Sequence, residues 1–183
     1  EILIGLVGSE MCIRDSKDAG RDVIAVGKIF DIFDGEGVTE KIKTTGNTNG
    51  IAFTKALQTR DFEGLAFVNL VDFDMLYGHR RDVAGYAAAA TEFDKFVADF
   101  IPGMREGDIL MVTADHGCDP SYTKTTDHTR EYVPYLICGK GVKPGVDLGT
   151  KLCFGTIAQT ICDYLGVDAS TLDGQSVLGD ILK

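Results

Sequence analysis

Residues 64–82 read GLAFVNLVDFDMLYGHRRD, and this stretch decides the fold class. It opens with an apolar run, residues 64–70, that predicts a buried strand. A polar segment with two aspartates and a histidine follows directly. Apolar residues then recur at helical spacing from residue 82 to residue 101, where Pro102 and Gly103 end the predicted helix. A strand, a polar loop and a long helix in this order are typical of an α/β domain.

The same alternation continues outward in both directions. Upstream, residues 22–29 predict another buried strand and residues 47–58 predict a helix. Downstream, residues 108–113 and 133–138 predict strands, and residues 156–165 predict a closing helix. We therefore expect an α/β fold with a mostly parallel central sheet and helices on both faces. In such sheets ligands bind beyond the carboxyl ends of the strands.

The charge balance restricts the partners. The 183 residues include 28 Asp and Glu against 18 Lys and Arg, a formal net charge of −10. This balance argues against binding to nucleic acid or to an anionic membrane, and no apolar run reaches the length of a membrane span. We infer no protein partner. The five cysteines are odd in number and form no CxxC pair, so we expect reduced thiols in a cytoplasmic protein.

The N-terminal residues do not fit this pattern. EMCIRDS, residues 10–16, shows neither helical nor strand periodicity. The string LVGSEMCIRDS resembles a translated sequencing-adapter read-through. We expect residues 1–16 to be a non-native segment that packs poorly, with the core domain over residues 17–183. An ordinary N-terminal linker is the alternative.

The only three histidines fall between residues 79 and 128, and each has an aspartate nearby on its N-terminal side. Asp74 and His79 are five residues apart in the loop after the strand 64–70, and Gly78 allows the backbone to turn there. A loop of this length can fold both side chains onto one metal ion. The alternative is that aspartates of this stretch cap the next helix, a role that fits Asp82 and one of the others.

The other two histidines belong to segments further along the chain. Asp115 and His116 directly follow the strand 108–113. Adjacent residues of a strand point to opposite faces, so this pair can share an ion only where the strand ends and twists, which Gly117 allows. His128 lies in a polar loop without periodicity, and this loop could supply a third segment of the site. Together these residues predict a metal centre.

The donor set indicates the class of metal. Mixed carboxylate and imidazole ligands suit Mn²⁺, Zn²⁺ or Fe²⁺ better than Ca²⁺. The five candidate ligands are too many for one catalytic ion and too few for two complete ones. We therefore expect a binuclear site that takes further ligands from elsewhere.

Several motifs carry a resemblance to a known family. NLVDFDMLYGHRRDVAGY (residues 69–86), TADHGCDP (113–120) and TDHTREYVP (126–134) are similar to the phosphopentomutases of the alkaline phosphatase superfamily. DVIAVGKIFDIFDGEGVTE (22–40) and TTGNTNG (44–50) are similar to the same family. The resemblance runs from about residue 22 to the C-terminus. It implies part of an alkaline-phosphatase-like core, the C-terminal half, without the inserted cap domain of that family.

The resemblance also implies a ligand set for two Mn²⁺, with other divalent ions possible. One ion would take Asp74, His79 and His128, and the other would take Asp115 and His116. The family interconverts ribose 1-phosphate and ribose 5-phosphate, and the 2-deoxy sugars, so the implied partner is a small-molecule pentose phosphate. A phosphothreonine and a bisphosphate sugar carry that reaction. The nucleophilic threonine and one metal-binding aspartate have no counterpart in these residues, so we expect this chain alone to be inactive.

Lys28 is a further candidate, because it ends the first predicted strand and could meet a substrate phosphate as a point charge. A solvated lysine at a strand end is the alternative. Other functions stay open as well. Cofactor-independent phosphoglycerate mutases carry a similar Asp-His-Gly step, but with a shorter Asp-to-His spacing and without HRRD or HTREYVP. A sulfatase or phosphodiesterase fits less well, and an inactive metal-binding half-domain is the non-enzymatic alternative.

Overall fold

The computed structural model describes residues 9–183, and residues 1–8 lie outside the described part. The chain divides into two compact units. Of the described residues, the first takes 9–43, 60–68 and 142–183, and the second takes 44–59 and 69–141. Between residues 9 and 183, no helix combines the length and the apolar character needed to cross a bilayer.

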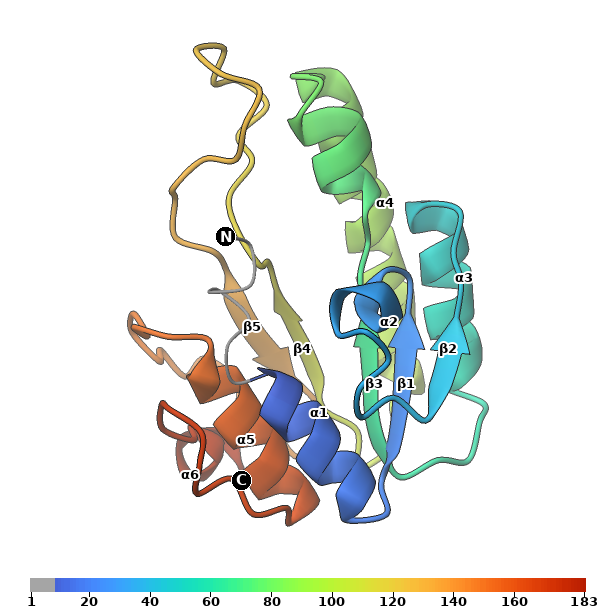
Figure 1. Cartoon of the computed structure of the whole chain (residues 1–183), viewed down its shortest axis with the longest axis vertical. Helices are drawn as coiled ribbons and strands as arrows, with labels where there is room; N and C mark the ends of the chain where they lie inside the picture. The colour runs from blue at the N-terminus through green and yellow to red at the C-terminus, as the bar shows by residue number, and fades with distance from the viewer. Residues whose placement is uncertain (1–8) are drawn as a thin grey trace. The chain divides into compact units, whose positions relative to one another are not determined.

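A three-stranded parallel sheet forms the centre of the first unit. Strand β1 (Asp22–Val26) lies between β2 (Glu40–Ile42) and β3 (Gly64–Val68), as Figure 1 shows. Both neighbours run parallel to β1. The parallel sheet and its helices confirm the predicted α/β class. Residues 23–26 of β1 are buried, whereas β3 is only half-buried. The strand predicted over residues 64–70 is present, but the prediction that it is buried is wrong, because β3 is an edge strand of this sheet.

Alternate side chains of β1 pack into a hydrophobic cluster on one face of the sheet. Val23 and Ala25 point the same way because successive strand residues alternate between faces. They contact Ile13, Ile29 and Phe33, all at most 4% exposed. Ile29 begins the short helix α2 (Ile29–Ile32), which follows β1 almost at once.

A helix that the sequence pattern missed supplies part of this core. Residues Ser9–Asp18 form α1, which lies beside α5 (Gly155–Leu165) in Figure 1. Cys12, Ile13 and Ser16 are buried, a spacing that places them on one helical stripe. The expectation that residues 1–16 lack helical character and pack poorly is thus wrong for residues 9–16. The remaining residues of that segment lie outside the described part.

The C-terminal residues complete the first unit. Cys12 packs with Ala158 and Cys162 of α5, and with Val167 and Leu172 beyond it. Gly166 ends α5 in a left-handed conformation, φ 68°, which is the usual helix stop for glycine. A short helix, α6 (Leu178–Ile181), follows. Among the described residues all five cysteines are free thiols.

The second unit combines two helices with a pair of strands. Helix α3 (Asn47–Leu57) packs along α4 (Val83–Phe100), as Figure 1 shows. Strands β4 (Leu110–Thr113) and β5 (Tyr135–Cys138) pair antiparallel. The sequence predicted both strands but suggested parallel pairing. A parallel pair needs a crossover connection, usually helical, whereas residues 114–134 return the chain without a helix.

The boundaries of α4 agree with the sequence. Asp82 caps its N-terminus by accepting a hydrogen bond from the Gly85 N–H at 2.9 Å. Pro102 lies in the 3₁₀ turn η3 (Ile101–Gly103) that follows the last α-helical residue, Phe100. The capping role considered for Asp82 is therefore confirmed.

Candidate metal centre

A single π-helical turn brings Asp74 and His79 together. Residues Phe73–Gly78 form this turn, η2, and the His79 N–H donates to the Asp74 carbonyl oxygen at 2.9 Å. A hydrogen bond between residues five apart defines a π-helix, and such turns are frequent at functional sites. The Asp74 Oδ1 and His79 Nε2 atoms lie 3.2 Å apart. Asp74 and His79 are five residues apart in the sequence, which is the spacing of the hydrogen bond in a π-helical turn.

His128 reaches the same point from the segment between β4 and β5. Its Nε2 atom lies 3.4 Å from Asp74 Oδ1, and its ring centroid lies 4.8 Å from that of His79. One ligand atom from each of Asp74, His79 and His128 lies within 4.8 Å of the others. All three belong to the second unit. The three residues could therefore hold one metal ion.

The oxygen at the centre of this group lacks a donor. Asp74 Oδ1 is buried, and no group in the described part of the chain donates a hydrogen bond to it. The Nδ1–H of His79 is directed at the Thr126 carbonyl oxygen. In the neutral imidazole this leaves a lone pair on Nε2, the atom that faces Asp74. A carboxylate oxygen and an imidazole lone pair face each other, and a cation is the group that satisfies both. The donor set therefore fits a divalent metal ion.

The second predicted pair lies next to this group without joining it. Asp115 Oδ2 and His116 Nε2 are 3.6 Å apart, just beyond the end of β4. The His116 ring stacks on the His128 ring with centroids 3.6 Å apart and planes 24° apart. All five predicted ligands therefore lie in one region of the second unit, as three close ligands and an adjacent pair.

Two glycines of the motifs are needed for space and not for backbone freedom. Neither Gly78 nor Gly117 has a positive φ. A Cβ at Gly78 would lie 2.6 Å from Cys118 Sγ and 2.9 Å from the Phe73 carbonyl oxygen. A Cβ at Gly117 would lie 2.8 Å from the Thr129 carbonyl oxygen. The prediction that these glycines let the backbone turn is therefore wrong, and close packing is the reason for glycine at both positions.

Two supporting interactions were missed by the sequence analysis. Asn47 and Asp72 bond reciprocally: the Asn47 N–H donates to Asp72 Oδ2 at 2.7 Å, and the Asp72 N–H donates to Asn47 Oδ1 at 2.9 Å. This pair ties the start of α3 to the residue before η2. The other is Arg81, whose guanidinium bonds only to backbone carbonyls and weakly to a thiol. Backbone acceptors leave no mark in a sequence, so no motif signalled this role.

Two titratable groups beside the ligands have shifted pKa values. Burial, and then the neighbouring Asp74 carboxylate, raise the pKa of the Cys118 thiol. Hydrogen bonds from the Ser121 hydroxyl and N–H lower the pKa of Asp119. Cys118 therefore stays a neutral thiol next to the site, and Asp119 stays ionised.

Lys28 belongs to the other unit. Its side chain is exposed, and the residue precedes α2, two positions beyond the end of β1. The strand predicted to run to residue 29 ends at Val26. Lys28 is therefore a residue of the turn after the strand.

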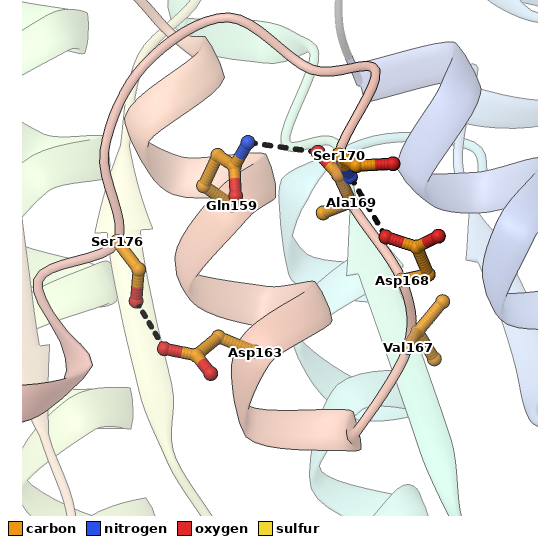
Figure 2. A pocket seen from close by; sticks show the side chains of 7 residues that line it. All are labelled: Gln159, Asp163, Val167, Asp168, Ala169, Ser170 and Ser176. Atoms are coloured by element: carbon orange, nitrogen blue, oxygen red, sulfur yellow. Dashed lines mark hydrogen bonds between the residues drawn. The ribbon is translucent and has the colours of Figure 1, made fainter.

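A depression of about 380 Å³ in the first unit is a weaker candidate for a ligand site than the metal centre. It is lined by residues of α5 and the segment after it, which Figure 2 shows. Gln159 Nε2 donates to the Ala169 and Leu172 carbonyl oxygens, both at 2.9 Å. Ser176 Oγ donates to Asp163 Oδ2 at 2.7 Å. Since these polar groups bond to one another, the depression presents no converging donors to a ligand.

Comparison with known proteins assigns the chain to a family. The model of the metalloenzyme superfamily matches residues 14–169. The chain belongs to the metalloenzyme superfamily. That match includes all five candidate ligands, and the superfamily agrees with a group of three residues that could hold a divalent metal.

Individual relatives extend this finding. The chain is 53% identical over 163 residues to a phosphopentomutase of Acetivibrio thermocellus, across 89% of this chain and 42% of that protein. It is 52% identical over 171 residues to a phosphopentomutase of Lachnoclostridium phytofermentans, across 93% of this chain and 43% of that protein. The resemblance to phosphopentomutases read from the motifs is thus confirmed. The chain spans about two fifths of the length of these curated relatives.

A solved structure shares the fold of this metalloenzyme-superfamily chain. It is a phosphoglycerate mutase of Leishmania mexicana, crystallised at low cobalt concentration, with a TM-score of 0.70. The match covers 90% of this chain and 38% of that one, at 17% sequence identity. It supports the alkaline-phosphatase-like α/β core.

Proposed function

We propose that this chain supplies metal-binding residues of a phosphopentomutase, which interconverts ribose 1-phosphate and ribose 5-phosphate and the corresponding 2-deoxy sugars. The substrate is a small-molecule pentose phosphate. A phosphothreonine donates its phosphoryl group to a sugar hydroxyl, whose proton leaves, and a bisphosphate sugar forms. The threonine then accepts the other phosphoryl group. The nucleophile lies outside these 183 residues, so the chain alone does not turn over the substrate.

The observation that carries this proposal is the unsatisfied Oδ1 atom of Asp74. It is buried without a hydrogen-bond donor among the described residues and faces the Nε2 atoms of His79 and His128. A buried polar atom without a partner costs free energy. The site is therefore arranged for a cation, and mixed oxygen and nitrogen ligands suit Mn²⁺ among other divalent ions.

The chain's own residues would act in two groups. Asp74, His79 and His128 would hold one Mn²⁺, while Asp115 and His116 would contribute to a second. Such a pair of ions would stabilise the charge on a transferring phosphoryl group. The Nδ1–H bond of His79 to the Thr126 carbonyl would leave its Nε2 lone pair available to an ion.

Lys28 is proposed to contact a substrate phosphate. Its ammonium group is a point charge suited to a phosphate, and its exposed position leaves it accessible. Replacing it with Met in a completed enzyme should raise the apparent KM for the sugar phosphate. Unchanged kinetics would show an ordinary surface lysine. We place the protein in the cytoplasm, where free cysteines persist.

A phosphoglycerate mutase is the second candidate function, favoured by the shared fold at a TM-score of 0.70. Its identity to this chain is 17%, against 53% and 52% for the two phosphopentomutases. The sugar phosphate is therefore the better-supported substrate.

Metal titration and reconstitution test the proposal together. The chain should bind Mn²⁺, and its Tm should rise as Mn²⁺ is added. At a free Mn²⁺ concentration one hundred times the Kd, binding should stabilise the folded chain by about 2.7 kcal/mol. Asp74→Asn should abolish both effects. Asp94→Asn is the matched control, because it removes the same charge from an exposed position of α4 in the same unit. Equal Mn²⁺ binding by the wild type and Asp74→Asn would contradict the site.

Activity is then assayed with the N-terminal part of the Acetivibrio thermocellus relative added. Ribose 1-phosphate should be converted to ribose 5-phosphate only in the mixture, and His79→Ala or Asp115→Ala should lose most of that activity. Turnover by the 183-residue chain alone would disprove the external nucleophile. Turnover of phosphoglycerate instead of the pentose phosphate would favour the second candidate.

A further inference from the structure

Arg81 has an unusual backbone conformation next to the candidate metal centre. Its φ is 56°, in the left-handed region that residues with a Cβ rarely occupy. Such a conformation is unfavourable and persists only where the surroundings compensate for it. The contacts of the Arg81 side chain provide that compensation.

All five N–H groups of the Arg81 guanidinium donate to backbone carbonyl oxygens. Nε donates to Thr125 at 2.9 Å. Nη1 donates to Gly78 at 3.0 Å and to Asp119 at 2.9 Å. Nη2 donates to Thr125 at 2.5 Å and to Asp127 at 2.7 Å. A guanidinium has five N–H donors, so this set uses all of them. None remains for a substrate phosphate.

These carbonyls belong to the two segments that carry the close histidines. Gly78 immediately precedes His79, and Asp127 immediately precedes His128. Thr125 and Asp127 also flank Thr126, whose carbonyl accepts the hydrogen bond from His79 Nδ1. One side chain therefore joins the η2 turn to the segment between β4 and β5 at the two positions next to the ligands.

We propose that Arg81 is the positioning residue of the metal centre, which holds His79 and His128 beside each other and next to Asp74 Oδ1 before a metal arrives. This inference rests on the proposed metal-binding function. The planar, forked shape of the guanidinium is the feature that matters, because it donates hydrogen bonds to four carbonyl oxygens in fixed directions. A lysine keeps the charge but offers three donors from one atom. Arg81→Lys should therefore be nearly as damaging as complete removal of the side chain.

The test uses the 183-residue chain with Arg81→Lys and Arg81→Gly. Glycine relieves the left-handed backbone, so Arg81→Gly should still fold. Mn²⁺ affinity is measured from the electron paramagnetic resonance of free Mn²⁺, and ligand geometry from the visible absorption of bound Co²⁺. Loss of a residue that orients ligands typically costs 10–100-fold in metal affinity. We expect both variants to lose this much and to change the Co²⁺ spectrum. Arg80→Gly, at the exposed neighbouring position, should leave both unchanged.

A metal-free measurement separates this inference from the proposed function. In ¹⁵N–¹H spectra of the metal-free chain, the Nδ1–H signal of His79 should be protected from exchange in the wild type and lost in both Arg81 variants. Retention of that signal in both variants, or Mn²⁺ affinity of Arg81→Lys within about twofold of wild type, would overturn the role of Arg81. If the wild-type chain binds no Mn²⁺, the proposed function fails, and the histidine signal still decides whether Arg81 positions His79.

Discussion

The imidazole ring of His116 stacks on that of His128, with centroids 3.6 Å apart and planes inclined by 24°. His128 belongs to the three close candidate ligands, and His116 belongs to the pair beyond β4. The contact joins two segments of the second unit that are twelve positions apart, 116 to 128. The orientation of one predicted ligand group therefore depends on a side chain of the other.

Replacing His116 should separate stacking from ligation. His116→Ala removes the ring from His128, and an aromatic pair of this kind contributes about 0.5–1.5 kcal/mol. We expect Mn²⁺ affinity at Asp74, His79 and His128 to fall by roughly 2–10-fold. His116→Phe keeps a ring on His128 without a ligand nitrogen, and should recover most of that affinity. Isothermal titration of the three proteins measures both effects. Equal losses in Ala and Phe would show that stacking contributes nothing.

Replacing Gly78 with Ala should destabilise the η2 turn. The added Cβ would lie 2.6 Å from Cys118 Sγ and 2.9 Å from the Phe73 carbonyl oxygen. Overpacking of this kind costs about 1–3 kcal/mol. Thermal unfolding should show the loss, and Cys118→Ala in the same chain should restore part of it. Gly107→Ala is the control, because nothing lies within 4 Å of its added Cβ. Identical Tm values for Gly78→Ala and Gly107→Ala would exclude close packing as the reason for Gly78.

Asp82→Ala should weaken the start of α4. The mutation removes the acceptor of the Gly85 N–H, and loss of an N-cap costs about 1 kcal/mol. A change of this size lowers the Tm by about 2–4 °C in a protein of this length. Asp82→Asn keeps a capping oxygen and should stay close to the wild type. If Asp82→Asn lowers the Tm as much as Asp82→Ala does, the loss of charge and not the loss of the cap is the cause.

The carboxyl group of Asp119 should titrate below its usual range. The Ser121 hydroxyl and N–H bond to the ionised form and lower its pKa. Because the folded-state pKa lies below the unfolded value, the contribution to stability is present above the unfolded pKa. It is lost as the pH falls through the folded pKa. Ser121→Ala should raise the pKa of Asp119, while Ser121→Thr keeps it low. Carbon-13 NMR of the carboxyl group measures the pKa, and an unchanged value in Ser121→Ala would contradict this cause.

Ile13→Ala should lower stability by about 2–5 kcal/mol, as is usual for a buried isoleucine. Ile13 is 1% exposed and packs against Val23, Ala25 and Ile29. Met11 is 38% exposed, so Met11→Ala should change stability by no more than about 0.5 kcal/mol. Urea denaturation of the two variants gives both values. If Ile13→Ala unfolds at the wild-type midpoint, helix α1 packs as loosely as its sequence alone predicted.

Most elements of the fold could be predicted because their signals are local. The strands at residues 22–26 and 64–68 and the helix Val83–Phe100 lie close to their predicted limits. Apolar periodicity and end signals such as Asp82 and Pro102 are enough to place such elements. Helix α1 was missed because its buried stripe is short and interrupted by charged residues. Strand β2 has three residues, too few for a periodic signal.

The candidate ligands were also predictable, since Asp and His pairs beside strand ends are visible in the sequence. The sequence by itself determined the α/β class, the order of the main elements and the five candidate ligands. The tertiary structure decided the antiparallel pairing of β4 with β5, the stacking of His116 on His128 and the contacts of Arg81. These depend on residues distant along the chain, and in the case of Arg81 on backbone carbonyls. Every residue carries a carbonyl, so only the folded chain determines which of them a guanidinium can reach.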